Sequence, residues 1–262
     1  MSQYQEKATV IRIEQFSEKN YRLTLDSPDI ATSAKAGQFV MIRAGLGKDP
    51  LLRRPFSIHQ TTTNGRIQIY FKIVGRGTDI LARVKVGETL SVFGPLGRGF
   101  TIRKDSPALI VGGGLGIAPM LFLAKSICRL KSDFSNDQII LAGRGKDEVE
   151  PLARDFRELG MKIQFATDDG SYGYHGLVTD LLSSLKFDAD CTVYTCGPEP
   201  MMAAVYTICQ ARSAACQVSV ESVMACGMGA CLGCSRSSRK GTYTHVCLNG
   251  PVFNAEDLIW NS

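Results

Sequence analysis

Apolar and polar positions alternate with a period of two along the first hundred residues of the chain, most clearly at 10–13, 21–25 and 67–73. Because successive side chains of a strand point to opposite faces, this period predicts β-strands. Turn-forming pairs cut the region into short pieces, and Asn64-Gly65 suits a hairpin since both residues tolerate positive φ. Residues 1–100 are therefore interpreted as an antiparallel β-barrel or sandwich.

From about residue 107 the pattern changes to short apolar runs that alternate with longer amphipathic stretches. Strands are expected at 108–111, 139–142, 162–166 and 192–195, and helices at 119–130, 149–159, 177–185 and from about 200 onward. Regular alternation of strand and helix predicts a parallel sheet covered by helices. Residues 101–216 are interpreted as an α/β domain.

The remaining segment, 217–262, is rich in glycine and cysteine and is not expected to build a core of its own without a metal or a partner. It holds Cys226, Cys231, Cys234 and Cys247. The spacing C-x4-C-x2-C with a distant fourth cysteine is the plant-type ligand pattern of a [2Fe-2S] cluster. A structural zinc site with His245 as a spare ligand is the alternative, although zinc ribbons usually present two C-x2-C pairs and this segment has one.

A glycine-rich turn, with Gly112, Gly113, Gly114 and Gly116, lies between the first strand and the first helix of the α/β region. Small residues let the backbone approach phosphates, and the start of the helix supplies amide donors, so the turn suits a pyrophosphate. It departs from the strict G-x-G-x-x-G pattern because Ile117 occupies the place of the third glycine. A tight strand-to-helix turn that only packs on the sheet is the alternative.

The last expected strand of the α/β region ends in Cys196-Gly197. Ligands of open parallel sheets lie outside the carboxyl ends of the strands, which places Cys196 where a nicotinamide would lie. A buried cysteine that only packs is the alternative. The loop 168–173 also follows an expected strand and either faces the same crevice or forms an exposed turn.

The barrel region carries arginine, aromatic and hydroxyl residues suited to holding a phosphate, covering a ring system and hydrogen-bonding its edge. A Gly-Thr pair that leads into a short helical stretch offers a second amide-lined phosphate site. An ordinary half-buried strand with solvated arginines is the alternative. The residues concerned are Arg54, Pro55, Phe56, Ser57, Tyr70, Phe71, Lys72, Gly77 and Thr78.

Composition excludes several other classes. The 262 residues are 44 % hydrophobic and 21 % charged, as in ordinary folded proteins. The net charge of +5 comes from scattered residues with no run of five like charges, which argues against nucleic-acid binding. Glycines and Pro119 interrupt the uncharged stretch 106–124, so no membrane span is expected. The first ten residues lack the apolar stretch of a signal peptide, so a cytoplasmic chain is expected.

The order of these motifs resembles the ferredoxin reductase superfamily: R-P-F-S in a barrel, G-G-G-L-G-I-A-P at the start of a nucleotide domain and C-G-P at its last strand. In that superfamily the barrel holds a flavin and the second domain a pyridine nucleotide. Segments 221–234 and 246–253 are similar to the electron-transfer subunit of class 1B dihydroorotate dehydrogenase. Cys226 favours this family, because related ferredoxin reductases carry an aspartate there.

The resemblance implies three cofactor sites. FAD would contact the barrel residues named above, NAD would face the glycine turn and Cys196-Gly197, and the four tail cysteines would ligate a [2Fe-2S] cluster. Phe56 stands where the wider superfamily often has tyrosine, which leaves the stacking partner of the flavin open. The choice of NAD over NADP rests on the resemblance alone, because Arg144 after the second α/β strand could meet a 2′-phosphate or be a solvated loop residue.

The resemblance further implies a role in pyrimidine biosynthesis. Electrons from the FMN of a separate dihydroorotate dehydrogenase catalytic subunit would pass through the cluster and FAD to NAD+, in a tetramer of two catalytic and two electron-transfer subunits. The chain is too short to add a (β/α)8 barrel and shows no substrate base of its own. A stand-alone reductase for another acceptor and a non-enzymatic zinc-binding regulator are the alternatives.

Overall fold

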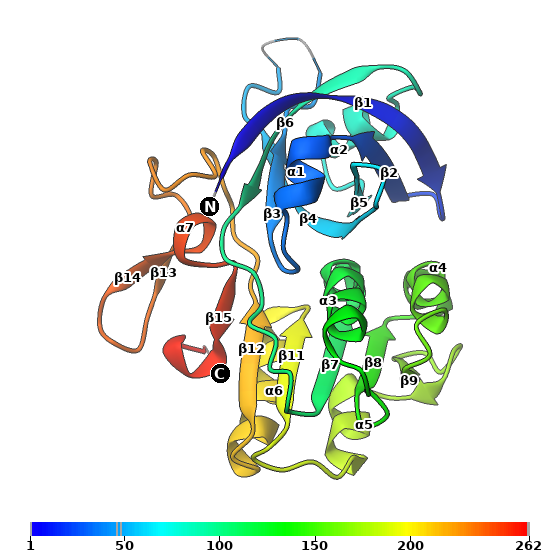
Figure 1. Cartoon of the computed structure of the whole chain (residues 1–262), viewed down its shortest axis with the longest axis vertical. Helices are drawn as coiled ribbons and strands as arrows, with labels where there is room; N and C mark the ends of the chain where they lie inside the picture. The colour runs from blue at the N-terminus through cyan, green and yellow to red at the C-terminus, as the bar shows by residue number, and fades with distance from the viewer. Residues whose placement is uncertain (1, 46, 48, 261–262) are drawn as a thin grey trace.

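The structure is a computed structural model, and it describes residues 2–45, 47 and 49–260. The predicted outer domain limits, Met1 and Ser262, lie outside these residues. A barrel lies above an α/β layer, and the last part of the chain runs alongside both (Figure 1).

The first part of the chain forms a closed barrel with strand order β1-β2-β5-β4-β3-β6, in which every pairing is antiparallel. Its strands are β1 (Tyr4–Gln15), β2 (Asn20–Asp26), β3 (Phe39–Ile42), β4 (Arg54–Thr61), β5 (Arg66–Lys72) and β6 (Thr89–Leu96), with helices α1 (Pro28–Ser33) and α2 (Arg76–Ala82) between them. Gly65, with φ +72°, makes the expected turn between β4 and β5. Leu23, Ile58 and Ile69 are among the fully buried residues at the barrel centre.

The second part forms a sheet with order β10-β9-β8-β7-β11-β12-β15, parallel except where β15 joins. Each expected strand and helix occurs, with bounds shifted by three residues or fewer, so the prediction of a parallel α/β layer is confirmed. The elements are β7 (Ala108–Gly113), the 3-10 turn η1 (Gly114–Gly116), α3 (Ile117–Leu130), β8 (Gln138–Gly143), α4 (Lys146–Arg157), β9 (Lys162–Thr167), β10 (Tyr174–His175), α5 (Val178–Ser184), β11 (Thr192–Cys196), α6 (Glu199–Ala211) and β12 (Ala215–Ser219).

Helix α4 illustrates why these segments fold as they do. Val149, Leu152, Ala153 and Phe156 are buried, at the spacing that places residues on one helix face. Its first turn is acidic and its last turn basic, which complements the helix dipole.

The last part of the chain is ordered by both layers. It contains β13 (Ser235–Ser237), β14 (Tyr243–His245), α7 (Val246–Asn249), β15 (Val252–Asn254) and the 3-10 turn η2 (Ala255–Asp257). Strand β15 pairs antiparallel with β12, so the tail extends the α/β sheet. Cys234 and Cys247 are buried in one hydrophobic cluster with Phe39 and Met41 of the barrel. The predicted limit between residues 216 and 217 lies inside β12.

Helix α3 lies directly beneath the barrel and packs against β4 (Figure 1). This packing brings the glycine turn before α3 close to the barrel strands that carry the candidate flavin residues. None of the described helices is long and apolar enough to cross a membrane.

Candidate functional site

A cleft of about 610 Å³ lies at the carboxyl ends of the parallel strands β7, β8 and β11. All three parts of the chain contribute to its wall, which is the position expected for a ligand of an open α/β sheet. Its lining includes Lys72 from the barrel, Gly113, Gly114, Gly116, Arg144, Glu148, Asp168, Gly197 and Glu199 from the α/β part, and Glu221 and Arg236 from the tail.

The glycine turn on one side of the cleft packs too closely for larger residues. A Cβ on Gly116 would lie 2.4 Å from the carbonyl carbon and oxygen of Cys196. A Cβ on Gly113 would lie 2.3 Å from the Met201 sulfur, and one on Gly112 3.2 Å from the Ile117 Cα. The turn and the end of β11 therefore meet, as the sequence motifs require if both face one ligand.

Cys196 itself does not line the cleft. Its side chain is 2 % exposed at the end of β11, and burial raises the pKa of the thiol. The next residue, Gly197, is part of the cleft wall. Asp168, the first residue of the loop 168–173, also faces the cleft, while Asp169 accepts the Ser171 amide at 2.9 Å and so holds the loop turn.

Ion pairs between parts of the chain border the cleft. Lys72 Nζ lies 3.6 Å from Glu148 Oε1 and joins the barrel to α4. Arg236 pairs with Glu199 at the start of α6 and joins the tail to the α/β part. Glu221 follows β12 at an exposed position of the cleft wall, and desolvation by the surrounding protein raises the pKa of its carboxyl.

Sequence reasoning missed Glu148, Glu199, Glu221 and Arg236 as cleft residues. Glu221 had a usable signal, because it closely follows a strand that pairs in parallel with β11. Arg236 had none, since only the folding of the tail against α6 brings it to the cleft.

The candidate flavin residues lie on β4, β5 and α2. Arg54 lies against Gly77, where a Cβ would approach the Arg54 Nε to 2.9 Å, so this part of the barrel juxtaposes a guanidinium and the start of α2. The Thr78 hydroxyl accepts the Val74 amide at 2.9 Å and the Gly75 amide at 3.1 Å, and this fixes the turn that begins the helix. Pro55 and Ser57 are partly exposed.

Aromatic residues of the same strands pack inward. The Phe56 and Phe71 rings meet edge to face with centroids 5.7 Å apart, and the two residues are 8 % and 3 % exposed. Tyr70 is buried, and its hydroxyl has no hydrogen-bond partner among the described residues. Burial raises the pKa of Tyr70 to about 12. A buried hydroxyl of this kind fits a site whose remaining polar groups come from a bound ligand.

The four tail cysteines fall into two pairs. Cys234 Sγ and Cys247 Sγ lie 3.2 Å apart, and the Cys231 side chain hydrogen-bonds Cys226. No three metal-binding side chains of the described residues are grouped as a site for one ion. Each iron of a [2Fe-2S] cluster needs two protein thiolates, and the two pairs match that requirement. His245 lies outside the pairs, with its Nδ1 3.0 Å from the Ser235 hydroxyl.

Backbone amides of the cysteine loop donate to the sulfurs. The Cys226 sulfur accepts the Met228 and Cys231 amides, each at 3.4 Å, and the Cys247 sulfur accepts the Gly229 amide at 3.1 Å. Burial would raise the pKa of Cys226, but the hydrogen bonds outweigh it and lower that pKa to about 6. The loop therefore stabilises the thiolate of Cys226, the form that binds iron, whereas burial raises the pKa of Cys247 to about 12.

Comparison with known proteins agrees with this geometry. Residues 7–100 match the model of the oxidoreductase FAD-binding domain, and residues 221–259 match the iron–sulfur cluster binding domain of dihydroorotate dehydrogenase B. The electron transfer subunit of dihydroorotate dehydrogenase B (NAD(+)) from Desulforamulus reducens is 36 % identical over 259 residues, covering 97 % of each chain. The chain belongs to this family of electron transfer subunits.

Other members of the family show the same extent of similarity. The Geobacillus kaustophilus electron transfer subunit is also 36 % identical, over 97 % of this chain and 98 % of its own. Family membership confirms the expectations of an oxidoreductase subunit with a FAD-binding domain and an iron–sulfur domain.

Solved structures extend the agreement to the fold. The NADH-dependent reduced ferredoxin–NADP oxidoreductase, studied for flavin-based electron bifurcation, has a TM-score of 0.83 and 28 % identity over 97 % of this chain and 90 % of its own. The ferredoxin reductase of carbazole 1,9a-dioxygenase has a TM-score of 0.66 and 22 % identity over 82 % of this chain and 67 % of its own, and shows the shared fold.

Proposed function

We propose that this subunit passes electrons from the FMN of a dihydroorotate dehydrogenase catalytic subunit through a [2Fe-2S] cluster and FAD to NAD+, in the synthesis of pyrimidines. When bound, the cluster supplies one-electron transfer and the flavin supplies the exchange between single electrons and a hydride. The chain's own residues hold and orient these groups.

The observation that carries this proposal is the shared cleft. The wall of this cleft includes Lys72 from the barrel, Gly116 from the α/β part and Glu221 from the tail. All three parts of the chain therefore meet at one ligand site. A protein that moves electrons between three centres needs them adjacent, because positioning supplies most of what the protein contributes.

The proposed sites follow the residues described above. The barrel residues line a flavin site, with a guanidinium beside a helix start for the diphosphate and an unpartnered Tyr70 hydroxyl for a polar edge. The glycine turn, with the end of β11, is proposed to hold the dinucleotide, and the two cysteine pairs the cluster. The full set is Arg54, Pro55, Phe56, Ser57, Tyr70, Phe71, Lys72, Gly77 and Thr78 for FAD, Gly112, Gly113, Gly114, Gly116, Cys196 and Gly197 for NAD, and Cys226, Cys231, Cys234 and Cys247 for the cluster.

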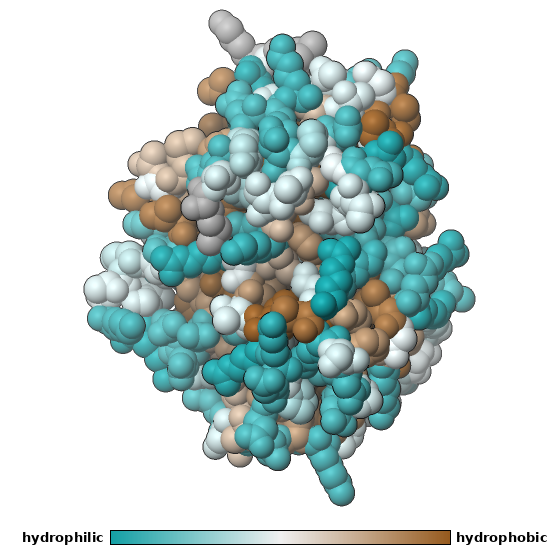
Figure 2. Space-filling view, viewed as in Figure 1, coloured by the Kyte–Doolittle hydropathy of each residue, from teal (hydrophilic) through white to brown (hydrophobic). Residues whose placement is uncertain are grey.

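The cysteine loop is also proposed as the face that meets the catalytic subunit. Cys231 is exposed, and apolar side chains stand out around it: Val223 is 87 % exposed, Met228 51 %, Leu232 55 % and Leu248 51 %. Brown surface gathers on the left of Figure 2, where Figure 1 places the loop before β13 and helix α7. Exposed apolar groups of this kind suit a protein partner, and we propose two catalytic and two electron-transfer subunits.

A cytoplasmic location is proposed with this role. All nine cysteines, including the four of the tail, are free thiols, which suits a reducing compartment.

Replacement of one cluster ligand tests the proposed route. Cys231→Ser in the complex with the catalytic subunit should retain NADH oxidation by artificial two-electron acceptors, which need only the flavin and the cleft. Dihydroorotate-dependent NAD+ reduction should be lost, because the path between the two flavins is cut. Equal survival of both activities would rule out the route through the cluster.

A reductase that serves another electron acceptor is the second candidate, and the similarity to a reduced ferredoxin–NADP oxidoreductase favours keeping it. The two are separated by mixing the purified subunit with the catalytic subunit. Dihydroorotate-dependent NADH formation supports the first function, and flavin reduction by NADH without any dihydroorotate-dependent activity supports the second.

A further inference from the structure

His59 lies where the candidate flavin strand meets the first turn of the nucleotide helix. It follows Ser57 by two positions on β4 and is completely buried, with 0 % exposure. Its Nδ1 lies 2.5 Å from the carbonyl oxygen of Ala118 in the first turn of α3. Since a carbonyl oxygen only accepts, Nδ1 carries the proton of this hydrogen bond. Ala118 comes two residues after Gly116, so the bond anchors the end of the glycine turn.

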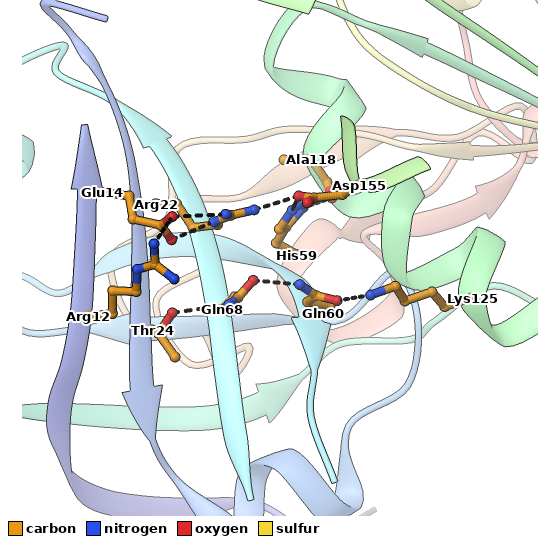
Figure 3. A network of polar contacts seen from close by, with 10 residues as sticks. All are labelled: Arg12, Glu14, Arg22, Thr24, His59, Gln60, Gln68, Ala118, Lys125 and Asp155. Carbon is orange, nitrogen blue, oxygen red and sulfur yellow. Dashed lines mark hydrogen bonds and ion pairs between the residues drawn. The ribbon is translucent and has the colours of Figure 1, made fainter. Parts of the chain in front are cut away.

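The second ring nitrogen faces another helix. Nε2 has no hydrogen-bond partner among the described residues, and the Asp155 carboxylate of α4 lies 3.5 Å away. Asp155 accepts the Arg22 guanidinium at 2.5 Å, and Arg22 also pairs with Glu14 at 2.9 Å (Figure 3). The imidazole therefore sits between one barrel strand and two helices of the α/β part.

The Asp155 carboxylate, which lies opposite Nε2 of His59, is negatively charged at neutral pH. Burial would raise the pKa of Asp155, but the nearby His59 imidazole and Arg22 guanidinium lower it overall. The carboxylate therefore stays ionised beside the ring at neutral pH.

A buried imidazole is a costly way to fill this space. Removing a polar nitrogen from water without a full hydrogen bond is unfavourable, and an apolar side chain such as that of neighbouring Ile58 would pack there without this cost. Unlike an apolar side chain, the histidine makes a directional hydrogen bond, which holds the Ala118 carbonyl of α3 at a fixed position against β4.

A second contact between the same two elements provides an internal comparison. Lys125 of α3 donates to Gln60 of β4, and Gln60 donates to Gln68 at 2.6 Å (Figure 3). Lys125 lies seven residues beyond Ala118, about two turns further from the cleft. Both contacts hold α3 to the barrel, but only His59 holds the turn that lines the cleft.

We propose that His59 is a positioning residue that fixes the glycine turn, Gly114–Gly116, relative to the flavin strand β4. It thereby sets how closely the nicotinamide end of a dinucleotide approaches the flavin. The effect on the approach of nicotinamide to flavin rests on the proposed function. The contact between His59 and the turn can be tested on the protein alone.

Three substitutions of His59 distinguish the contributions of its two ring nitrogens. His59→Asn keeps an amide donor near the position of Nδ1, His59→Gln places one nearer Nε2, and His59→Leu removes both. Gln60→Leu is the matched control, since it cuts the contact further along α3. All four are made in the full chain.

Amide hydrogen exchange tests the contact without any redox reaction. The amides of α3 at 117, 118, 120 and 121 should exchange at least about tenfold faster in His59→Leu and His59→Gln than in the wild type, because the turn opens more often. His59→Asn should stay within about threefold of the wild type. Gln60→Leu should leave these amides unchanged and alter only those near Lys125.

Stopped-flow reduction by NADH tests the consequence. His59→Leu should reduce its flavin about tenfold to a hundredfold more slowly while it retains wild-type amounts of FAD and iron, because a misplacement of about 1 Å is enough. Gln60→Leu should lower the thermal midpoint but keep the wild-type rate.

The outcomes are distinguishable. Wild-type exchange in His59→Leu, or first-turn exchange in Gln60→Leu as fast as in His59→Leu, would overturn the positioning role. If NADH does not reduce the flavin of the wild-type protein, the proposed function is wrong. The comparison of amide exchange would still decide whether His59 holds the turn.

Discussion

A single methyl group at Gly116 should disable the nucleotide site. In Gly116→Ala the added Cβ would lie 2.4 Å from the Cys196 carbonyl carbon and 2.5 Å from the Gly197 amide nitrogen. Both are backbone atoms, so no side-chain rotation relieves the overlap. An ordinary contact needs about 3.5–4 Å, and therefore the glycine turn and the end of β11 must separate by about 1 Å.

This separation has two measurable costs. Overpacking of this size destabilises a protein by about 1–3 kcal/mol, which leaves most molecules folded. A displacement of about 1 Å between reacting groups slows a reaction about a hundredfold. We therefore expect a modest fall in thermal midpoint, unchanged FAD and iron content, and flavin reduction by NADH slowed about a hundredfold.

Stopped-flow absorbance of the anaerobic protein measures that rate directly. Gly47→Ala is the control, since among the residues that the structure describes its added Cβ would meet only the Asp49 amide nitrogen, at 3.9 Å, and the variant should react at the wild-type rate. Full-rate reduction in Gly116→Ala would refute the placement of the dinucleotide between this turn and β11.

Three further predictions concern other parts of the molecule. Cys231→Ser should lose the iron–sulfur absorption while flavin stays bound, whereas Cys209→Ser, a buried thiol outside the cluster loop, should keep both. Lys131→Met should lower the free energy of unfolding in urea by about 3–5 kcal/mol, because Lys131 and Asp137 form a nearly buried ion pair at 2.7 Å and one charge would be left alone. The pKa of Asp155 is lowered in the folded state, so its stabilising contribution exists above the ordinary value of 3.8 and is lost as the pH falls through the folded pKa. Asp155→Asn should therefore lose less thermal stability than the wild type between about pH 6 and about pH 3, as followed by circular dichroism.

Local patterns predicted much of this fold. The period-two alternation around Leu23 and Ile69 gave the barrel strands, and the glycine turn marked the junction of β7 and α3 within two residues. The cysteine spacing indicated a cluster because three of the four ligands lie on one loop, where the sequence itself sets the geometry. These features depend on neighbours in the chain.

Features set by tertiary contact were not predictable in the same way. Strand β15 has three residues, too few for an alternating pattern to predict a strand, yet it pairs with β12. Phe56 sits among residues suited to a flavin, but the register that turns its ring toward Phe71 is visible only in the folded barrel. Arg236 reaches the cleft only because the tail packs on α6.

The contacts of His59 also could not be predicted from the sequence. In the sequence it has no partner at a spacing that suggests a site, and no role could be assigned to it. The structure pairs it with Ala118 and Asp155, which lie 59 and 96 positions further along the chain. Contacts between such distant positions require the relative placement of barrel and α/β layer.

The visible absorption spectrum of the anaerobically purified chain, recorded before and after addition of NADH, tests the central claim most directly. The account predicts flavin bands superimposed on broad iron–sulfur absorption, with the flavin bands bleached by NADH. Flavin absorption without a cluster would contradict the assignment of the four tail cysteines, and a folded but colourless protein would contradict the electron-transfer function as a whole.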